Sequence, residues 1–159
     1  MPKKTVNLRI VNRQYSESLE QRGEAFSRAL NLEDEIEIMT EGTLYHKPGA
    51  TYIAYDEPEA TGFDNDKTVI RLADGVLSIK RYGGESEGQL DLTLQEGVRS
   101  ITTYVVPMAR FELEVYTHEI GHDLSEEGFG KIYADYNIRF ADFGRMRNKL
   151  QIDITDMRG

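Results

Sequence analysis

Apolar and polar residues alternate with a period of two along most of the chain, and this alternation restricts the fold more than any other feature. Val6, Leu8 and Ile10 have polar residues between them, and Phe111–Thr117 carries one of the cleanest patterns. Successive side chains of a β-strand point to opposite faces, so each such segment predicts a strand with one buried and one solvated face. Comparable segments are 34–45, 51–55, 68–73, 76–82, 90–94, 98–106, 132–140 and 150–154.

Short turn signals separate these segments. Asp74-Gly75 is the strongest hairpin signal, Glu96-Gly97 predicts a second hairpin, and Pro48-Gly49 suits a tight turn. The other expected connections are a polar loop from Asp56 to Lys67, a turn at Gly83-Gly84 and a corner at Pro107. Strands joined by such short turns in chain order form an antiparallel meander.

A meander with one apolar face must bury that face and protect its two edges, and closure into a barrel does both. We therefore predict an all-β, up-and-down antiparallel barrel of about eight to ten strands. A two-sheet sandwich is the alternative. The length of 159 residues suits a single domain, 1–159.

The segment from Gln14 to Glu33 departs from the alternation. Ala25, Phe26, Ala29 and Leu30 have the spacing of a helix face and follow Gly23. The sequence predicts an irregular or short helical excursion here, and an extended excursion is the alternative.

The composition of the chain argues against several classes of function. A net charge of −9 disfavours binding to nucleic acid or to an anionic membrane surface by repulsion. The absence of cysteine excludes disulfides, thiolate metal sites and cysteine nucleophiles. No apolar run approaches the roughly 20 residues of a membrane helix, and the N-terminal segment lacks the apolar core of a signal peptide. A cytoplasmic protein is expected.

The motif His118-Glu119-Ile120-Gly121-His122 spells H-E-x-x-H, in which two helical histidines bind zinc and the glutamate activates water. That chemistry requires a helix, yet the motif directly follows the strand predicted at Phe111–Thr117. The longer form of the motif would place a third histidine at Gly128, and no glutamate follows Glu127. We expect no catalytic residues, no cofactor and no metal site, with His118 and His122 as adventitious metal ligands at most.

Arg81 and Tyr136 lie at unusual positions in the pattern. Arg81 is in phase with the apolar face of its strand, and Tyr136 is in phase with Ile132. A buried arginine needs an anionic partner, which is either a carboxylate of the protein or an acidic ligand in the barrel mouth. With Tyr55, at the end of the strand predicted at 51–55, these are the candidate ligand-binding residues.

The order of several short motifs resembles the YwiB-like family of bacterial proteins of unknown function. The matching residues are Thr40-Glu41-Gly42, Tyr45, Tyr52, Tyr55-Asp56-Glu57, Thr61-Gly62, Arg81, Gly83, Gly97, Tyr104, Pro107, Thr117, Ile120, Gly130, Ile132, Ala134 and Tyr136. The resemblance implies a calycin-type barrel related in shape to lipocalins. It implies no activity and no catalytic residues.

Three functions are compatible with these observations. The first is a non-enzymatic barrel that binds a small molecule in its mouth, an analogy that rests on the fold alone. The second is a structural or interaction module whose barrel is filled by its own side chains. The third is a zinc hydrolase built on the H-E-x-x-H motif, which the strand pattern argues against. The sequence makes no prediction about oligomeric state.

Overall fold

The structure is a computed structural model that describes residues 3–56, 67–82, 90–106, 109–140 and 144–157. Its regular elements are all strands. They are β1 Lys4–Arg22, β2 Ala25–Lys47, β3 Ala50–Asp56, β4 Lys67–Ala73, β5 Val76–Tyr82, β6 Leu90–Gln95, β7 Arg99–Val106, β8 Ala109–Leu124, β9 Gly130–Phe140 and β10 Gly144–Asp156. The described part holds no helix that is long and apolar enough to cross a membrane.

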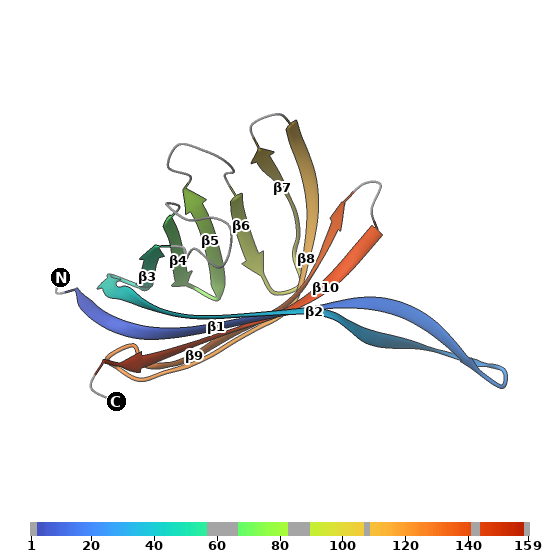
Figure 1. Cartoon of the computed structure of the whole chain (residues 1–159), viewed down its shortest axis with the longest axis horizontal. Helices are drawn as coiled ribbons and strands as arrows, with labels where there is room; N and C mark the ends of the chain where they lie inside the picture. Colours follow the sequence, from blue (N-terminus) through green and yellow to red (C-terminus); the bar gives the residue numbers. More distant parts are fainter. Residues whose placement is uncertain (1–2, 57–66, 83–89, 107–108, 141–143, 158–159) are drawn as a thin grey trace.

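The ten strands form one antiparallel sheet in the order β6-β5-β4-β3-β2-β1-β10-β9-β8-β7. Strands that are adjacent in the chain pair with each other, except β6 and β7. The pairing of β1 with β10 joins the first strand of the chain to the last. The strands β6 and β7 end the order and approach each other across a seam (Figure 1). The all-β, up-and-down antiparallel barrel is therefore confirmed, in a nearly closed form.

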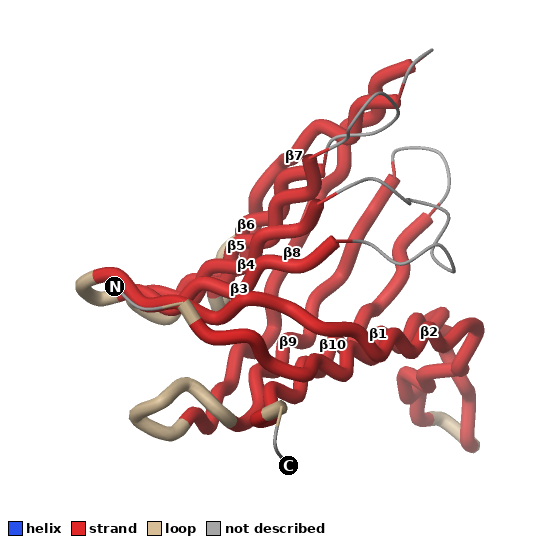
Figure 2. The backbone as a smooth tube through the Cα atoms, turned by 60° about the vertical axis from the view of Figure 1, so that its left-hand side comes forward, coloured by secondary structure: helices blue, strands red, loops and turns tan. Residues whose placement is uncertain are grey.

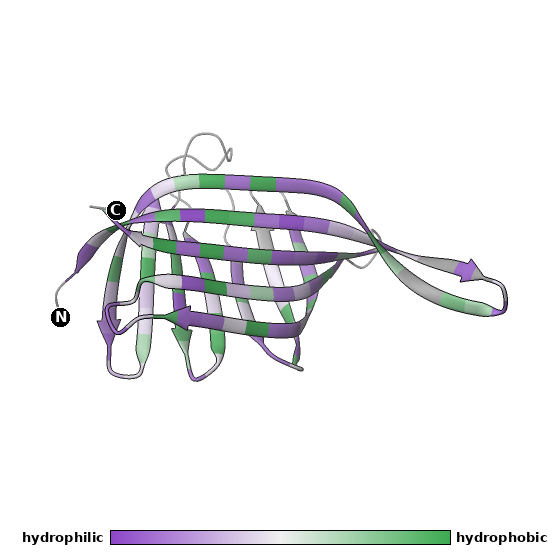
Figure 3. Ribbon diagram, turned by 90° about the horizontal axis from the view of Figure 1, so that it is seen from below, coloured by the Kyte–Doolittle hydropathy of each residue, from purple (hydrophilic) through white to green (hydrophobic). Residues whose placement is uncertain are grey.

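The inner face holds the core, as the alternation predicts. Apolar side chains from β1 to β6 and from β8 to β10 form one cluster, and the alternation of polar and apolar residues is visible along the strands in Figure 3. The core residues with the least exposure are Val6, Leu77, Leu94, Ala134 and Ile152. The second face is mostly exposed, although Val11 on β1 and Asp135 on β9 are buried there.

The two ends of the barrel differ. In an up-and-down meander, alternate connections lie at the same end. One end carries the turns after β2, β4, β6 and β8, which are all described (Figure 2). At the opposite end lie the β1–β2 hairpin, the last residues of β3, β5, β7 and β9, and the first residues of β4, β6, β8 and β10. The expected polar loop after Asp56, the turn at Gly83-Gly84 and the corner at Pro107 lie outside the described residues.

The irregular or short helical excursion predicted for Gln14 to Glu33 is wrong, and the extended alternative is what the structure shows. This segment is neither irregular nor helical, because Tyr15–Arg22 of β1 pairs continuously with Ala25–Leu32 of β2. A two-residue turn at Gly23-Glu24 joins them, with φ +66° at Gly23. The result is a two-stranded arm that projects from the barrel (Figure 1). Cross-strand pairing far along the chain decides the structure here, and the helical spacing of Ala25, Phe26, Ala29 and Leu30 is a coincidence.

Candidate functional site

The H-E-x-x-H motif lies on strand β8, which runs from Ala109 to Leu124. Thr117 opposes Tyr136, Glu119 opposes Asp135, and His118 is the extra residue of a β-bulge between them. The geometry that would bring two helical histidines to one zinc ion is therefore absent, and the hydrolase interpretation is wrong in its structural premise.

The bulge also separates the two histidines. The His118 ring packs edge-on against Tyr116 at 4.9 Å, on the outer face. His122 opposes the core residue Ile132 and is exposed at the strand end. A hydrogen bond to Glu119 and, second, burial raise the pKa of Tyr133 to about 12. The Glu119 carboxylate therefore accepts a hydrogen bond from Tyr133 on the outer face. Among the described residues, no three His, Asp or Glu side chains gather as a metal site would require.

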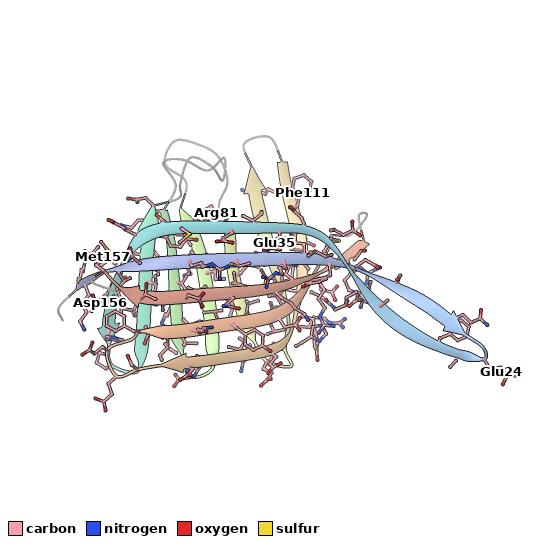
Figure 4. The ribbon with its side chains drawn as sticks, turned by 60° about the horizontal axis from the view of Figure 1, so that its bottom comes forward. Glu24, Glu35, Arg81, Phe111, Asp156 and Met157 are labelled. Atoms are coloured by element: carbon pink, nitrogen blue, oxygen red, sulfur yellow. The ribbon has the colours of Figure 1, made fainter. Side chains whose placement is uncertain are left out.

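The structure places two of the three candidate ligand residues in one cross-strand row. Tyr55 on β3 opposes Thr68 on β4, and Thr68 opposes Arg81 on β5. Tyr55 and Thr68 are buried, and Arg81 is partly buried near the end of β5, at the end of the barrel that also carries the β1–β2 hairpin. Figure 4 shows Arg81 on this wall. Opposed residues share a face, so this wall presents a phenol, a hydroxyl and a guanidinium to the interior.

Tyr136, the third candidate, lies on a different wall, on β9. It opposes Thr117 on β8 and Asn148 on β10. Burial raises the pKa of Tyr136 to about 12, so its phenol is neutral at physiological pH. Thr117 and Asn148 are fully buried. This wall is polar but uncharged, and in the described part no hydrogen bond connects it to Tyr55 or Arg81.

Asn12 on β1 extends the polar wall. Its side-chain amide donates to Asn148 Oδ1 at 3.3 Å, and Asn148 Nδ2 donates to the Met146 carbonyl at 3.3 Å. We call Asn12, Thr117, Tyr136 and Asn148 the interior polar cluster. Asn12 is in phase with Val6, Leu8 and Ile10 and therefore faces the barrel interior.

Two atoms of the interior polar cluster are buried without a partner in the described structure. They are Thr117 Oγ1 and Asn12 Oδ1. A buried polar atom without a hydrogen bond costs about 1–3 kcal/mol, and native proteins rarely retain such atoms without a reason. Hydroxyl or amide groups brought in by a ligand would each satisfy one of these atoms.

Sequence reasoning missed Asn12, Thr68, Thr117 and Asn148. Each is a polar residue at a position whose phase is that of the core, and that signal is present in the sequence. What the sequence does not contain is the register that brings Thr117, Tyr136 and Asn148 side by side from three strands.

Two depressions are lined by described residues. One, of about 220 Å³, is lined by Thr5, Glu41, Gly42, Thr43, Ala54, Tyr55, Asp56 and Lys67, and so includes the candidate residue Tyr55. Gly42 lies close to β1, because a Cβ there would overlap the Leu8 side chain. The second, of about 330 Å³, lies beside Tyr133 and His122. Neither contains the interior polar cluster.

These features define the class: a nearly closed, ten-stranded antiparallel barrel with an apolar interior and an uncharged polar cluster on one inner wall. The chain belongs to the family described as a domain of unknown function, DUF1934, whose model matches residues 22–152. The comparison with curated proteins found no match.

The fold is similar to the crystal structure of the ywiB protein from Bacillus subtilis, with a TM-score of 0.70. The two are 21% identical, and the match covers 96% of this chain and 92% of the other. This agreement confirms the resemblance inferred from the ordered motifs.

Proposed function

We propose that this protein binds a small molecule inside its barrel and does not catalyse a reaction. The small molecule enters through the end of the barrel that carries the β1–β2 arm. The observation that carries the proposal is the pair of buried, unpartnered atoms Thr117 Oγ1 and Asn12 Oδ1. Barrels of this size hold a single small ligand when their interior is not completely filled. The resemblance to calycin-type barrels concerns the fold alone, and the proposal adds a ligand-binding role.

The chemistry of the interior polar cluster suggests what the ligand carries. Asn12 Oδ1 can only accept a hydrogen bond, and Thr117 Oγ1 can donate or accept. A hydroxyl or amide N–H therefore suits this wall better than a carboxylate. The rest of the interior is leucine, isoleucine and valine, which suits an apolar body. The proposed ligand is a small amphipathic molecule with a neutral polar end.

The proposal needs no metal or cofactor. It also agrees with a cytoplasmic location, since a chain without cysteine has no need of an oxidising compartment.

A filled barrel that serves as an interaction module is the second candidate. It is supported by the single apolar cluster that reaches nearly every strand. The two candidates make opposite demands on the interior polar cluster. In a ligand-binding barrel, the Thr117 hydroxyl binds the ligand. In a filled barrel, burial of this hydroxyl only lowers the free energy of unfolding.

The test combines native mass spectrometry with the isosteric substitution Thr117→Val. The purified wild-type protein is expected to carry a co-purified small molecule, or to bind hits from a fragment library rich in alcohols and amides. Thr117→Val is expected to weaken that binding about tenfold or more. It should raise the free energy of unfolding of the ligand-free protein by roughly 1 kcal/mol, because it removes a buried hydroxyl without a partner.

The control is Thr155→Val, at an exposed position on β10. It should leave both the binding and the stability unchanged. A wild-type protein that carries no small molecule and binds none of the fragments would refute the ligand hypothesis. Together with a stabilised Thr117→Val variant, that result would favour the filled barrel.

A further inference from the structure

Two tyrosines lie side by side on the outer face of the barrel wall. Tyr45 on β2 opposes Tyr52 on β3, and Tyr52 opposes Arg71 on β4. Their neighbours along the chain, Leu44 and Ile53, belong to the core, so the two tyrosines point outward. The tyrosine rings are nearly parallel, with an angle of 5° between their planes and 5.0 Å between their centroids.

Three cations surround this pair of rings. Lys3 Nζ lies 5.3 Å from the centre of the Tyr45 ring. Lys47 Nζ and the guanidinium carbon of Arg71 lie 5.1 and 5.9 Å from the centre of the Tyr52 ring. Arg71 Nε also donates a hydrogen bond to the Tyr52 hydroxyl at 3.1 Å. We call Lys3, Tyr45, Lys47, Tyr52 and Arg71 the cationic tyrosine patch.

The cationic tyrosine patch contains no carboxylate. Among the described residues, no ion pair includes Lys3, Lys47 or Arg71. On β2 to β5, the outer positions that flank the row of Tyr45, Tyr52 and Arg71 are threonine, alanine, valine and lysine, without Asp or Glu. The chain has 28 Asp and Glu against 19 Lys and Arg, so a surface with three cations and no carboxylate runs against its composition.

The contacts with the rings hold the three cations in place but do not neutralise their charge. Lys47 and Arg71 lie near the same ring and repel each other. The Tyr52 oxygen accepts a hydrogen bond from Arg71, and the proton of the Tyr52 hydroxyl is still able to bond an acceptor. The cationic tyrosine patch therefore combines positive charge with hydrogen-bond donors, which suits an oxyanion such as a carboxylate.

The net charge of the chain decides which kind of anion fits. A nucleic acid or an anionic membrane would extend its negative charge over the rest of a protein with net charge −9, and would be repelled there. A short acidic segment of a protein avoids this repulsion, because screening limits its interactions to charges within about 8–10 Å. Charge complementarity therefore favours a short acidic segment.

The dimensions of the cationic tyrosine patch suit an extended segment. Lys3 directly precedes β1 and Arg71 lies on β4, so the two residues are three strand spacings apart, about 14 Å. In an extended peptide, alternate side chains lie on one side at intervals of about 6.6 Å. Carboxylates at three alternate positions therefore cover the distance between Lys3 and Arg71.

We propose that the cationic tyrosine patch docks a short, extended, acidic segment of a partner protein. Lys3, Lys47 and Arg71 form ion pairs with the carboxylates of this segment, and the hydroxyls of Tyr45 and Tyr52 donate hydrogen bonds to them. This surface lies on the outside of the wall, so the inference holds whether or not the barrel interior binds a ligand.

The test is a titration of the protein, followed by amide chemical shifts in NMR, with an acetylated peptide that carries glutamate at three alternate positions. The wild-type protein is expected to bind this peptide with a dissociation constant on the order of 0.1–1 mM, with the largest shifts on β2, β3 and β4. The double variant Lys47→Gln/Arg71→Gln should raise that constant about five- to tenfold. The control is Lys80→Gln, which removes an exposed cation from the same face and should leave binding unchanged, because Lys80 is already paired with Asp91 at 3.9 Å.

A second comparison uses the wild-type protein alone and so does not depend on the folding of any variant. The same peptide with glutamine in place of glutamate should cause no saturable shifts. Absence of shifts with the glutamate peptide overturns the proposal, and so does an equal loss of binding for Lys80→Gln and the double variant. Tighter binding of a short oligothymidylate than of the glutamate peptide would assign the cationic tyrosine patch to nucleic acid and would also overturn it.

Discussion

At the scale of single residues, two glycines at chain reversals differ in what a side chain would meet. Gly130 begins β9 with φ +143°, and a Cβ there would overlap the carbonyl oxygen of Asp123. Gly75 has φ +75° in the β4–β5 turn, and a Cβ there would have nothing within 4 Å. Both positions disfavour other residues, but only Gly130 combines an unusual φ with a backbone clash.

We therefore expect Gly130→Ala to lower the free energy of unfolding by about 3 kcal/mol or more. The matched variant Gly75→Ala should cost only about 1 kcal/mol, because the strain of the backbone conformation is its only penalty. Urea unfolding followed by circular dichroism measures both. Equal costs for the two variants would show that β9 can shift away from Asp123.

Asp135 and Arg147 form an ion pair on the outer face. Arg147 donates two hydrogen bonds of 2.7 Å to the Asp135 carboxylate, which is 7% exposed. Burial alone would raise the pKa of Asp135, but the hydrogen bonds and positive charge of Arg147 outweigh it and hold that pKa below its ordinary value. The ionised pair therefore stabilises the folded state.

This pair predicts a pH dependence. A carboxyl group whose pKa is lowered by folding stabilises the protein above its unfolded pKa, near 4, and this stabilisation disappears as the pH falls through the folded pKa. Asp135→Asn should cost about 2 kcal/mol at pH 7, and the difference from wild type should shrink below about pH 4. The control Asp91→Asn, in an exposed pair with Lys80, should cost little at any pH. A pH-independent cost at Asp135 would contradict the assignment.

At the scale of elements, the bulge at His118 keeps the core side of β8 in register. Before it, Leu113, Val115 and Thr117 face inward, and after it the inward residue is Ile120, which opposes Ala134. The apolar positions thus change from odd to even numbers. The change from odd to even positions can be seen in the sequence, and the β-bulge at His118 is its physical reason.

Deletion of the bulged residue tests this account. Without His118, Thr117 still opposes Tyr136 and Glu119 still opposes Asp135, so the variant should fold with a loss of about 1–2 kcal/mol at most. Deletion of Tyr116 should be much more costly. It would push His118 inward toward Tyr136 and turn Thr117 outward. Thermal unfolding of the two variants compares them directly, and equal stability would refute a role for the bulge in setting the phase.

The arm shows why the rest of β1 and β2 could not be predicted. A strand segment was recognisable only where a core imposes alternation, as at Val6–Ile10. On the arm, neither face packs on the core, so the pattern weakens from Tyr15 onward. The bulge between Gln14 and Tyr15, which leaves Glu33 unpaired, further shifts the phase of β2. Only the pairing of the two segments with each other reveals the strands.

At the scale of the whole molecule, the meander was predictable because each hairpin is a local event. Asp74-Gly75 and Glu96-Gly97 each predict a chain reversal between neighbouring strands. A series of such reversals leaves few alternatives to a barrel or a sandwich. The closure was not predictable in detail. It depends on β1 meeting β10, through pairs such as Leu8 with Ile154 that lie at opposite ends of the chain. The interior polar cluster depends on the same long-range register.

The seam between β6 and β7 is the last point of closure and differs from every other junction. No backbone ladder joins these strands in the part of the chain that the structure describes. Instead, side chains on β7 donate to carbonyls on β6. The Ser100 hydroxyl donates to the Thr93 carbonyl at 3.4 Å, and the Thr102 hydroxyl donates to the Asp91 carbonyl. At this junction, side-chain hydroxyls on β7 replace backbone amides as the hydrogen-bond donors to β6.

Replacing both hydroxyls should open the seam without unfolding the barrel. The double variant Ser100→Ala/Thr102→Val is expected to lose about 1–3 kcal/mol of stability, since each hydrogen bond contributes roughly 0.5–1.5 kcal/mol. Hydrogen exchange should accelerate in β6 and β7 and remain slow in β1, β9 and β10. Thr103→Val, at an exposed position of the same strand that faces the other way, is the control. Uniform acceleration in all ten strands would show that the seam is an integral part of one cooperative unit. Selective acceleration would identify β6 and β7 as the edge along which this barrel opens.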